Sequence, residues 1–461
     1  MALVEQPWVA IGLVLAAFLA LFLTLAAIAR GSRVAPEVSR KLFHVGSGLL
    51  TLSFPFLFRE LWPVLLLTGA SAVLLISVRH FPVLRTHLGH VAHRVDRTTR
   101  GDLYFPIAVL AVFWLSQLSG TPGPTAPGLR TEPLLFVIPI LMLTLADATG
   151  ALVGGRYGRT PYVGASKSLE GSIAFLATGF LCVHVPLLLW STVGRTESLL
   201  IASTLALLVM LLEGSAWRGL DNLFVPIGGF FLLRAYLPMD AAALWPRLLV
   251  TLALVALIMF ARRRTTLEDA ALVAGAFFCY VAWAVMGWVW LMPPMAVVAG
   301  YRWLSPHTSD NRRRIHDVPA MLSIWAPAVI WLVLARARGD AALLFPYTVA
   351  FGAHLAMFGT SRLAAQFPGR SIASAFGRAV IVSGGMVMIP YLLVTSAQGS
   401  LWLLLGAMAS IAIGTAAFVR AEPDIRHASL TSRRWVSQGA AAAVASATGW
   451  VAMSALHSLV S

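Results

Sequence analysis

Charged residues and cysteine are scarce in this chain, and each shortage excludes a class of protein. Only 11% of the 461 residues are charged, 59% are hydrophobic, and the mean hydropathy is +0.81. Soluble domains carry about 25% charged residues, so this composition excludes a soluble globular fold. The two cysteines, Cys182 and Cys279, lie in separate apolar runs without a C-x-x-C partner. Neither a disulfide framework nor a thiolate metal site is therefore expected.

Lysine is almost absent. Only Lys41 and Lys167 occur among the 34 basic residues, and the others are arginine. A chain with so strong a preference for arginine is expected to lose lysine wherever arginine serves equally well. We therefore expect these two positions to need a compact ammonium group rather than a planar guanidinium.

The arginines are dispersed through loops, although the net charge of +15 is high. No soluble basic face with interleaved aromatic residues is present, so nucleic acid is not an expected partner. If the loop at residues 30–41 is cytoplasmic, alternation puts the other arginine-rich loops on that side, as the positive-inside rule requires. These loops cover residues 80–100, 156–167, 214–221 and 262–264. The composition, rich in arginine and alanine, suggests a prokaryotic plasma membrane.

Apolar stretches of 17 to 22 residues recur along the whole chain. Each can cross a hydrocarbon core of about 30 Å, so we predict an all-α, polytopic integral membrane protein with about 15 to 16 transmembrane helices. The first stretch is too long for a signal-peptide core and is expected to be retained. The polar clusters lie in residues 1–262, and residues 263–461 form a second transmembrane domain without a legible function. Two halves of similar size leave a transporter as an alternative.

The most informative segment is ADATGALVGGRYGRTPYVGASKSLEGS, at residues 146–172. Its Asp147, Gly150, Gly154 and Gly158 follow one another at spacings that put them on one helix face. Such glycines form either a small-x-x-x-small packing seam or a site of close ligand approach. An aspartate inside an apolar span costs a few kcal/mol unless it is paired or functional, which favours a site.

A second polar group follows where the next span begins, and it contains Lys167, Ser168, Glu170 and Gly171. A cation at a helix N-terminus opposes the helix dipole, whereas an anion there is favoured. Lys167 therefore indicates a phosphate lying between the lysine and the helix. The alternative is a lysine that only marks the membrane boundary.

Two further clusters flank this segment. Arg40, Lys41 and His44 share one helix face, where His44 could accept a proton from an alcohol, bind a phosphate, or be an ordinary buried histidine. Arg40 and Lys41 could equally be boundary anchors. The other cluster contains Glu213, Asp221 and Asn222. Its residues either cap a helix or supply oxygen ligands for Mg²⁺ opposite Asp147.

Three motifs follow one another along the chain: RKLFHVGSG, then DATGALVGGRYG with SKSLEGS, then a glutamate followed after seven residues by DNLFVP. Together they resemble the polyprenol kinase family, which includes dolichol kinase and phytol kinase. That family is related to phosphatidate cytidylyltransferase. The resemblance covers roughly residues 38–230. It implies CTP-dependent phosphorylation of a membrane-dissolved alcohol. The chain has Asp147-Ala148-Thr149-Gly150 where family members often have Asp-Ala-x-Ala.

The motifs and the resemblance together lead to expected roles for individual residues. The expected catalytic residues are Asp147, Lys167, His44 and Asp221. The expected Mg²⁺ ligands are Asp147, Asp221 and Glu213. The expected nucleotide-binding residues are Arg40, Lys41, Gly154, Gly158, Lys167, Ser168, Glu170, Gly171 and Asn222.

The expected reaction is transfer of the CTP γ-phosphoryl group to phytol, geranylgeraniol or dolichol at the cytoplasmic face. The alternatives are cytidylyl transfer and transport. No Walker A sequence occurs, so a P-loop kinase is excluded. The sequence leaves the particular alcohol and the oligomeric state open.

Overall fold

The computed structural model describes most of the chain as α-helix. The described residues are 6–31, 36–81, 101–119, 132–162, 167–215, 219–262, 265–304, 316–395, 400–422, 424–426 and 431–460. They contain no strand, only two isolated bridges. Among them, 13 helical spans are long and apolar enough to cross a membrane, while α2, α11 and the segment Trp288–Tyr301 are shorter. The predicted all-α, polytopic membrane fold is confirmed.

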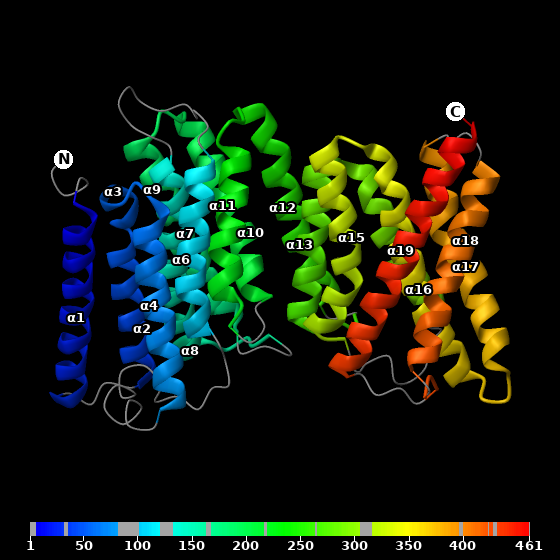
Figure 1. Ribbon diagram of the computed structural model, residues 1–461, viewed down its shortest axis with the longest axis horizontal. Coiled ribbons are helices and arrows are strands. Elements are labelled where there is room, and N and C mark those ends of the chain that lie inside the picture. The colour runs from blue at the N-terminus through cyan, green and yellow to red at the C-terminus, as the bar shows by residue number, and fades with distance from the viewer. Residues whose placement is uncertain are drawn as a thin grey trace. The chain divides into compact units, whose positions relative to one another are not determined.

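The chain divides into two compact units, Met1–Val255 and Ala256–Ser461. The division falls inside α12 (Ala241–Ala261), slightly before the boundary at residue 262 that the sequence suggests. Buried hydrophobic residues occur in both units. Figure 1 shows the helices in chain order, from the blue N-terminal end to the red C-terminal end.

The first unit is built from helices that run back and forth. They are α1 (Pro7–Gly31), α2 (Pro36–Thr51), the short α3 (Phe54–Leu57), α4 (Leu61–His80), α6 (Gly101–Leu118), α7 (Glu132–Leu141), the π-helical turn η1 (Met142–Ala146), α8 (Asp147–Tyr157), α9 (Leu169–Trp190), α10 (Arg195–Gly214) and α11 (Asp221–Tyr236). Its most buried span is α10, whose apolar window is 78% buried and which packs against α9 and α11. The polar ends of these three helices are thereby held close together.

The second unit has the same all-helical character. It consists of α13 (Asp269–Met286), η2 (Trp288–Leu291), α14 (Met292–Leu304), α15 (Val318–Arg338), η4 (Ala341–Leu343), α16 (Leu344–Gln366), α17 (Ile372–Thr395), α18 (Ser400–Ala421) and α19 (Ser432–Val460). The central helix is α16, whose apolar window is 83% buried and which packs against α15, α17, α18 and α19.

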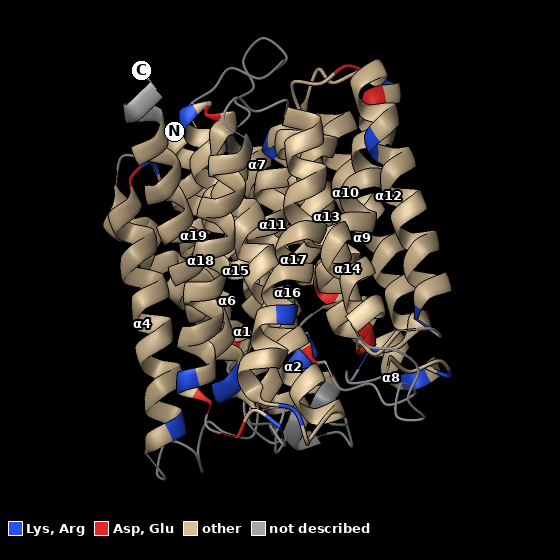
Figure 2. Cartoon of the chain, turned by 90° about the vertical axis from the view of Figure 1, so that its right-hand side faces the viewer, with Lys and Arg blue, Asp and Glu red and all other residues tan. Residues whose placement is uncertain are grey.

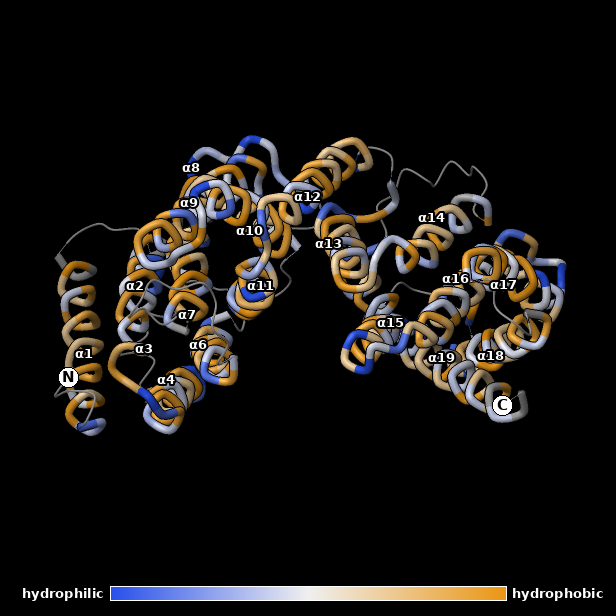
Figure 3. Tube along the Cα trace, turned by 90° about the horizontal axis from the view of Figure 1, so that it is seen from above, coloured by the Kyte–Doolittle hydropathy of each residue, from blue (hydrophilic) through white to orange (hydrophobic). Residues whose placement is uncertain are grey.

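Charge and hydropathy follow the pattern of a membrane protein. Charged residues are concentrated toward the helix ends, and long uncharged sections separate them (Figure 2). Large apolar side chains such as Leu249 and Phe260 stay exposed on the helices instead of facing a core. Hydrophobic positions accordingly occur widely on the helices of both units (Figure 3). An apolar outer surface of this kind is suited to contact with lipid.

Candidate active site

Asp147 is placed by a break in helical register. The segment from α7 through η1 to α8 forms one continuous span, Pro133–Tyr157. In η1 the N–H of Asp147 donates to the carbonyl of Met142, five residues back, instead of to Leu143 as in an α-helix. The Leu143 carbonyl loses that donor and accepts His44 Nε2 at 3.1 Å. The π-helical turn therefore ties α2 to the start of α8.

Lys41 forms the first buried ion pair of the site. Its Nζ donates to Asp147 Oδ2 at 2.6 Å, and the two residues are only 6% and 4% exposed. His44 Nε2 lies 3.7 Å from the same carboxylate oxygen, and the His44 ring stands edge-on to Phe105 at 5.1 Å. Arg40, half-buried on the same helix, interacts electrostatically with His44. The helix-face argument from the sequence thus agrees with how α2 presents these residues.

Lys167 forms the second charged group. Its Nζ donates to Glu213 Oε1, at the end of α10, and to Asp221 Oδ2, at the start of α11, at 3.2 Å. Burial by itself would lower the pKa of Lys167, but the neighbouring carboxylates of Glu213 and Asp221 raise it above its ordinary value. Lys167 is therefore held as a cation between two acids.

The two groups belong to one cluster, because Lys167 also interacts electrostatically with Asp147. We call it the lysine–acid cluster, and it comprises Lys41, His44, Asp147, Lys167, Glu213 and Asp221. Both lysines of the chain are in it, each in contact with at least one carboxylate. These partners come from α2, α8, the segment before α9, and the facing ends of α10 and α11.

The glycines of α8 face α9 across a close contact. A methyl group on Gly150 would meet the Gly171 carbonyl oxygen at 3.2 Å, and one on Gly171 would meet Gly154 Cα at 3.1 Å. Gly158 lies against Ser168, where an added methyl would come within 3.0 Å of Ser168 Cβ. The glycines therefore form the small-x-x-x-small packing seam that was one of the two alternatives from the sequence. A nucleotide contact by Gly154, Gly158 or Gly171 stays a prediction.

Ser168 and Glu170 shape the segment that carries Lys167. Ser168 is the N-cap of α9, and its Oγ accepts the N–H of Gly171 at 3.2 Å. The Glu170 carboxylate accepts hydrogen bonds from the N–H and Oγ1 of Thr160 at 3.2 and 3.0 Å. An isolated bridge between Pro161 and Ser168 closes the same loop. A direct role of Ser168 or Glu170 in nucleotide binding also stays a prediction.

Asn222 joins two helix starts. Its Nδ2 donates to the carbonyl of Gly101 at 2.6 Å, which ties α11 to α6. Asp221 is the first residue of α11, and Leu220 occupies the N-cap position without a side-chain cap. Asp221 Oδ1 accepts the N–H of Asn222 at 3.1 Å, in the first turn of the helix, while its Oδ2 accepts the hydrogen bond of Lys167.

Sequence reasoning missed two features of the site. The π-helical turn before Asp147 has no signature in the sequence, and without it the bond from His44 to Leu143 could not be foreseen. The loop contacts of Thr160 with Glu170 were also missed. A threonine ten residues before a glutamate is too common a pattern to predict them.

The carboxylates offer hard oxygen donors of the kind that Mg²⁺ prefers. Within the described ranges, no group of three or more His, Cys, Asp and Glu residues is arranged to hold a metal ion. Mg²⁺ bound with a nucleotide needs only one or two carboxylates, because phosphates and water complete its coordination. The donor set of Asp147, Glu213 and Asp221 therefore fits a metal that arrives with phosphates.

These features define an integral membrane protein with a buried cluster of lysines and carboxylates near the ends of several spans. The chain is 32% identical over 226 residues to a phytol kinase of Synechocystis sp. (strain ATCC 27184 / PCC 6803 / Kazusa). The matched region is 48% of this chain and 88% of that kinase. No protein-family model and no solved structure matches the chain. The chain belongs to the phytol and polyprenol kinase-like family.

Proposed function

We propose that this protein transfers the γ-phosphoryl group of CTP to the hydroxyl group of a long-chain prenol of the phytol, geranylgeraniol or dolichol type. Its relationship to a phytol kinase supports the reaction class. The observation that carries the proposal is the lysine–acid cluster, in which Lys41 and Lys167 are held against Asp147, Glu213 and Asp221.

Phosphoryl transfer depends mainly on positioning and on stabilising charge, and the cluster supplies both kinds of group. The prenol oxygen attacks the γ-phosphorus while the bond from that phosphorus to the β,γ-bridging oxygen breaks, and CDP leaves. Lys167, with Lys41 and Arg40, neutralises the charge that develops on the transferred group. The lysines exchange carboxylate partners for phosphate oxygens when the nucleotide binds.

The hydroxyl proton passes to His44. A carbonyl oxygen can only accept a hydrogen bond, so the bond to Leu143 places the proton of neutral His44 on Nε2. Nδ1 is then the nitrogen that accepts the proton of the alcohol. The nearby carboxylate of Asp147 stabilises the resulting imidazolium.

Asp147, Asp221 and Glu213 would hold Mg²⁺ together with the phosphates. The ion would supply further neutralisation of phosphate charge. We assign the nucleotide itself to the facing ends of α8 and α9, with Gly154, Gly158, Ser168, Glu170 and Gly171, and to Asn222. The arginine-rich loops favour the cytoplasm as the compartment of this site, at the depth where a prenol hydroxyl lies.

The test is incubation of the purified protein with γ-labelled CTP, Mg²⁺ and a panel of prenols and diacylglycerol, followed by analysis of the lipid phase. Label in a prenyl phosphate with release of CDP is expected. Release of pyrophosphate with a CDP-lipid product would instead identify a cytidylyltransferase. Label only from γ-labelled ATP would overturn the assignment of CTP.

Asp147→Asn is the variant that tests the site. It removes the charge that pairs with Lys41, and turnover should be abolished while the protein still inserts into membranes. The matched control is Asp240→Asn, at an exposed position where Asp240 accepts the N–H of Ala243 at 2.9 Å. Turnover retained in Asp147→Asn would remove this residue from the mechanism.

A further inference from the structure

A second group of basic side chains, two arginines and a histidine, lies in the second unit, remote in sequence from the lysine–acid cluster. His316 precedes α15, Arg362 lies in the last turns of α16, and Arg434 lies in the first turn of α19. We call these three residues the arginine site. The sequence shows them only as members of basic loops, and no role in the kinase reaction requires them.

Arg434 is buried without full hydrogen bonding. It is 6% exposed, its Nη2 donates to Ser361 Oγ at 2.9 Å, and its guanidinium lies 5.3 Å from the Phe418 ring centroid. Its Nη1 is buried and has no hydrogen-bond partner in the described part of the chain. A buried donor without an acceptor costs about 1–3 kcal/mol, and more when the group is charged. A cation in a first helical turn is also opposed by the helix dipole.

Arg362 has aromatic neighbours in place of acids. Its guanidinium lies 6.0 Å from the Tyr301 ring centroid and 5.5 Å from that of Phe358. Such contacts use the face of the group, while its N–H donors point outward in the plane. Among the residues that the structure describes, no hydrogen bond or ion pair of Arg362 with a side chain is found. Its donors are therefore available to an acceptor.

His316 completes the arginine site. It is 9% exposed, its ring lies 5.6 Å from Tyr301 and 5.9 Å from Trp435, and its Nδ1 is buried without a partner in the described ranges. Burial, together with the charges of Arg362 and Arg434, lowers the pKa of His316 from 6.5 to about 4. The three groups converge, because the Tyr301 and Phe358 rings lie against both His316 and Arg362, and Arg434 donates to Ser361, the neighbour of Arg362 in α16.

We propose that the arginine site binds the phosphate group of a phosphomonoester. Two guanidinium groups match the charge of a phosphate dianion and its preference for forked N–H donors. The phosphate would satisfy the buried donor of Arg434 and the unused donors of Arg362. It would also offset the unfavourable position of Arg434 at the start of α19. The group could come from a lipid phosphate or from a water-soluble phosphate.

Glu422 offers a rival explanation. It follows α18 and attracts Arg434 electrostatically, but the described residues show no ion pair between them. Its Oε1 is buried and has no hydrogen-bond partner in the same part of the chain. If Glu422 were simply the counter-ion of Arg434, the site would need no ligand. A phosphate would instead compete with this carboxylate for Arg434.

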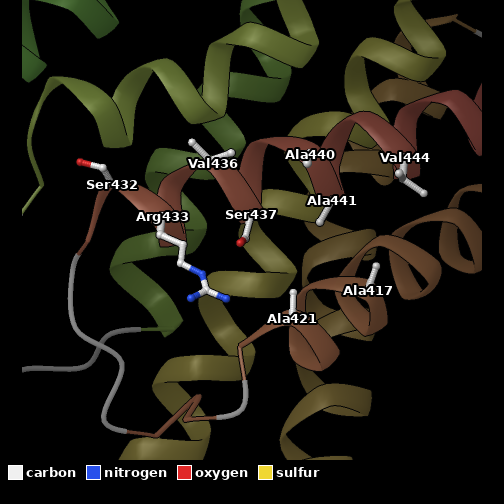
Figure 4. Close-up of a pocket in the computed structure, with 9 residues that line it drawn as sticks. All are labelled: Ala417, Ala421, Ser432, Arg433, Val436, Ser437, Ala440, Ala441 and Val444. Carbon is white, nitrogen blue, oxygen red and sulfur yellow. The ribbon is translucent and has the colours of Figure 1, made fainter.

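Arg433 provides a matched control. It lies beside Arg434 in the sequence but lines a different feature, an open groove of about 580 Å³ between α18 and α19. Figure 4 shows Arg433 and Ser432 at one end of this groove, with Ser437 and alanine and valine side chains along the rest. Removing its charge changes the net charge of α19 without removing a member of the arginine site.

The experiment is calorimetric titration of the full-length protein in uncharged detergent, in separate arms with dodecyl phosphate, inorganic phosphate and dodecanoate. No nucleotide or prenol is present, so the result does not depend on the proposed kinase reaction. Binding of dodecyl phosphate alone would identify a lipid phosphate as the ligand. Binding of both phosphates would show that the phosphate group suffices. Equal binding of dodecanoate would overturn the assignment to phosphate.

Arg434→Gln and Arg362→Gln should each weaken binding about tenfold or more, whereas Arg433→Gln should change it less than about twofold. Arg434→Lys keeps a buried cation at this position but removes the guanidinium group, so it separates the effect of the group from that of the charge. Glu422→Gln removes the competing carboxylate and should tighten binding. Binding that is unaffected by Arg434→Gln, Arg434→Lys and Arg362→Gln alike would overturn the proposal. So would a Glu422→Gln protein that loses stability and gains no affinity for phosphate.

Discussion

At the scale of single residues, the two lysines decide how the candidate site is charged. Lys167 touches Glu213 and Asp221, and Lys41 touches Asp147. An ammonium group can direct three donors at converging carboxylates, whereas a guanidinium spreads its donors over a plane. This difference in geometry gives a reason why both lysines of this arginine-rich chain lie in the lysine–acid cluster.

Replacing Lys167 with methionine should destabilise the protein and remove its activity. The change leaves Glu213 and Asp221 close together without a cation, and breaking a buried pair in this way costs about 3–5 kcal/mol. Lys167→Arg should recover most of the stability and little of the activity, because the larger planar group cannot occupy the same position. Thermal unfolding in detergent and the prenol kinase assay measure the two effects.

Arg79→Met is the control for this change. Arg79 pairs with Asp102 at 3.3 Å, and both side chains are partly exposed, so the loss should cost about 0–1 kcal/mol. An Lys167→Arg protein with full activity would contradict the need for an ammonium group.

At the scale of helices, the seam between α8 and α9 sets the distance between Asp147 and Lys167. Gly171→Ala places a methyl group 2.7 Å from the Gly150 carbonyl oxygen, so the helices must separate. We expect a loss of about 1–3 kcal/mol in stability, a fall in turnover, and a rise in the KM for the nucleotide, which we assign to the same residues. Chemical unfolding and steady-state kinetics test this.

The matched control is Gly155→Ala in α8, the other helix of the seam, where an added methyl group meets no atom within 4 Å. Alanine is the better helix former by about 1 kcal/mol, so this variant should be as stable as the parent or more so. If both glycine variants behave alike, the seam does not control the site.

The helices were predictable from the sequence to different degrees. Long apolar runs specify spans, and the glycine spacing specifies a shared face, because both depend on local periodicity. The partners of the charged residues were not predictable. Lys41 and Asp147 are 106 residues apart, and Lys167 and Asp221 are 54 apart, so their contact depends on how distant helices pack.

The same limit explains what the sequence left open. The spacing of Asp147 and its glycines allows both a packing seam and a ligand site, the aspartate favours the site, and only the contact with α9 identifies the seam. The register shift in η1 could not be predicted, because its residues, MLTLA, are ordinary helix formers. In the sequence, Arg434 is one of many arginines near loops, and only the structure shows that it is buried.

At the scale of the whole chain, each of the two units contains one of the two candidate sites. The related phytol kinase is matched over 88% of its length by 48% of this chain, so that kinase is too short to contain two units of this size. The lysine–acid cluster is formed entirely by residues of the first unit, Met1–Val255. The arginine site is formed entirely by residues of the second.

A fragment of residues 1–262 should therefore retain prenol kinase activity, within about tenfold of the full chain, because its site and the core around α10 are complete. The same fragment should lose the dodecyl phosphate binding that depends on Arg362 and Arg434. The assays are label transfer from CTP and calorimetry, with full-length Arg434→Gln as the control that lacks only the second property. An inserted, folded fragment without kinase activity would show that the second unit takes part in the reaction, and the assignment of catalysis to the first unit alone would then be wrong.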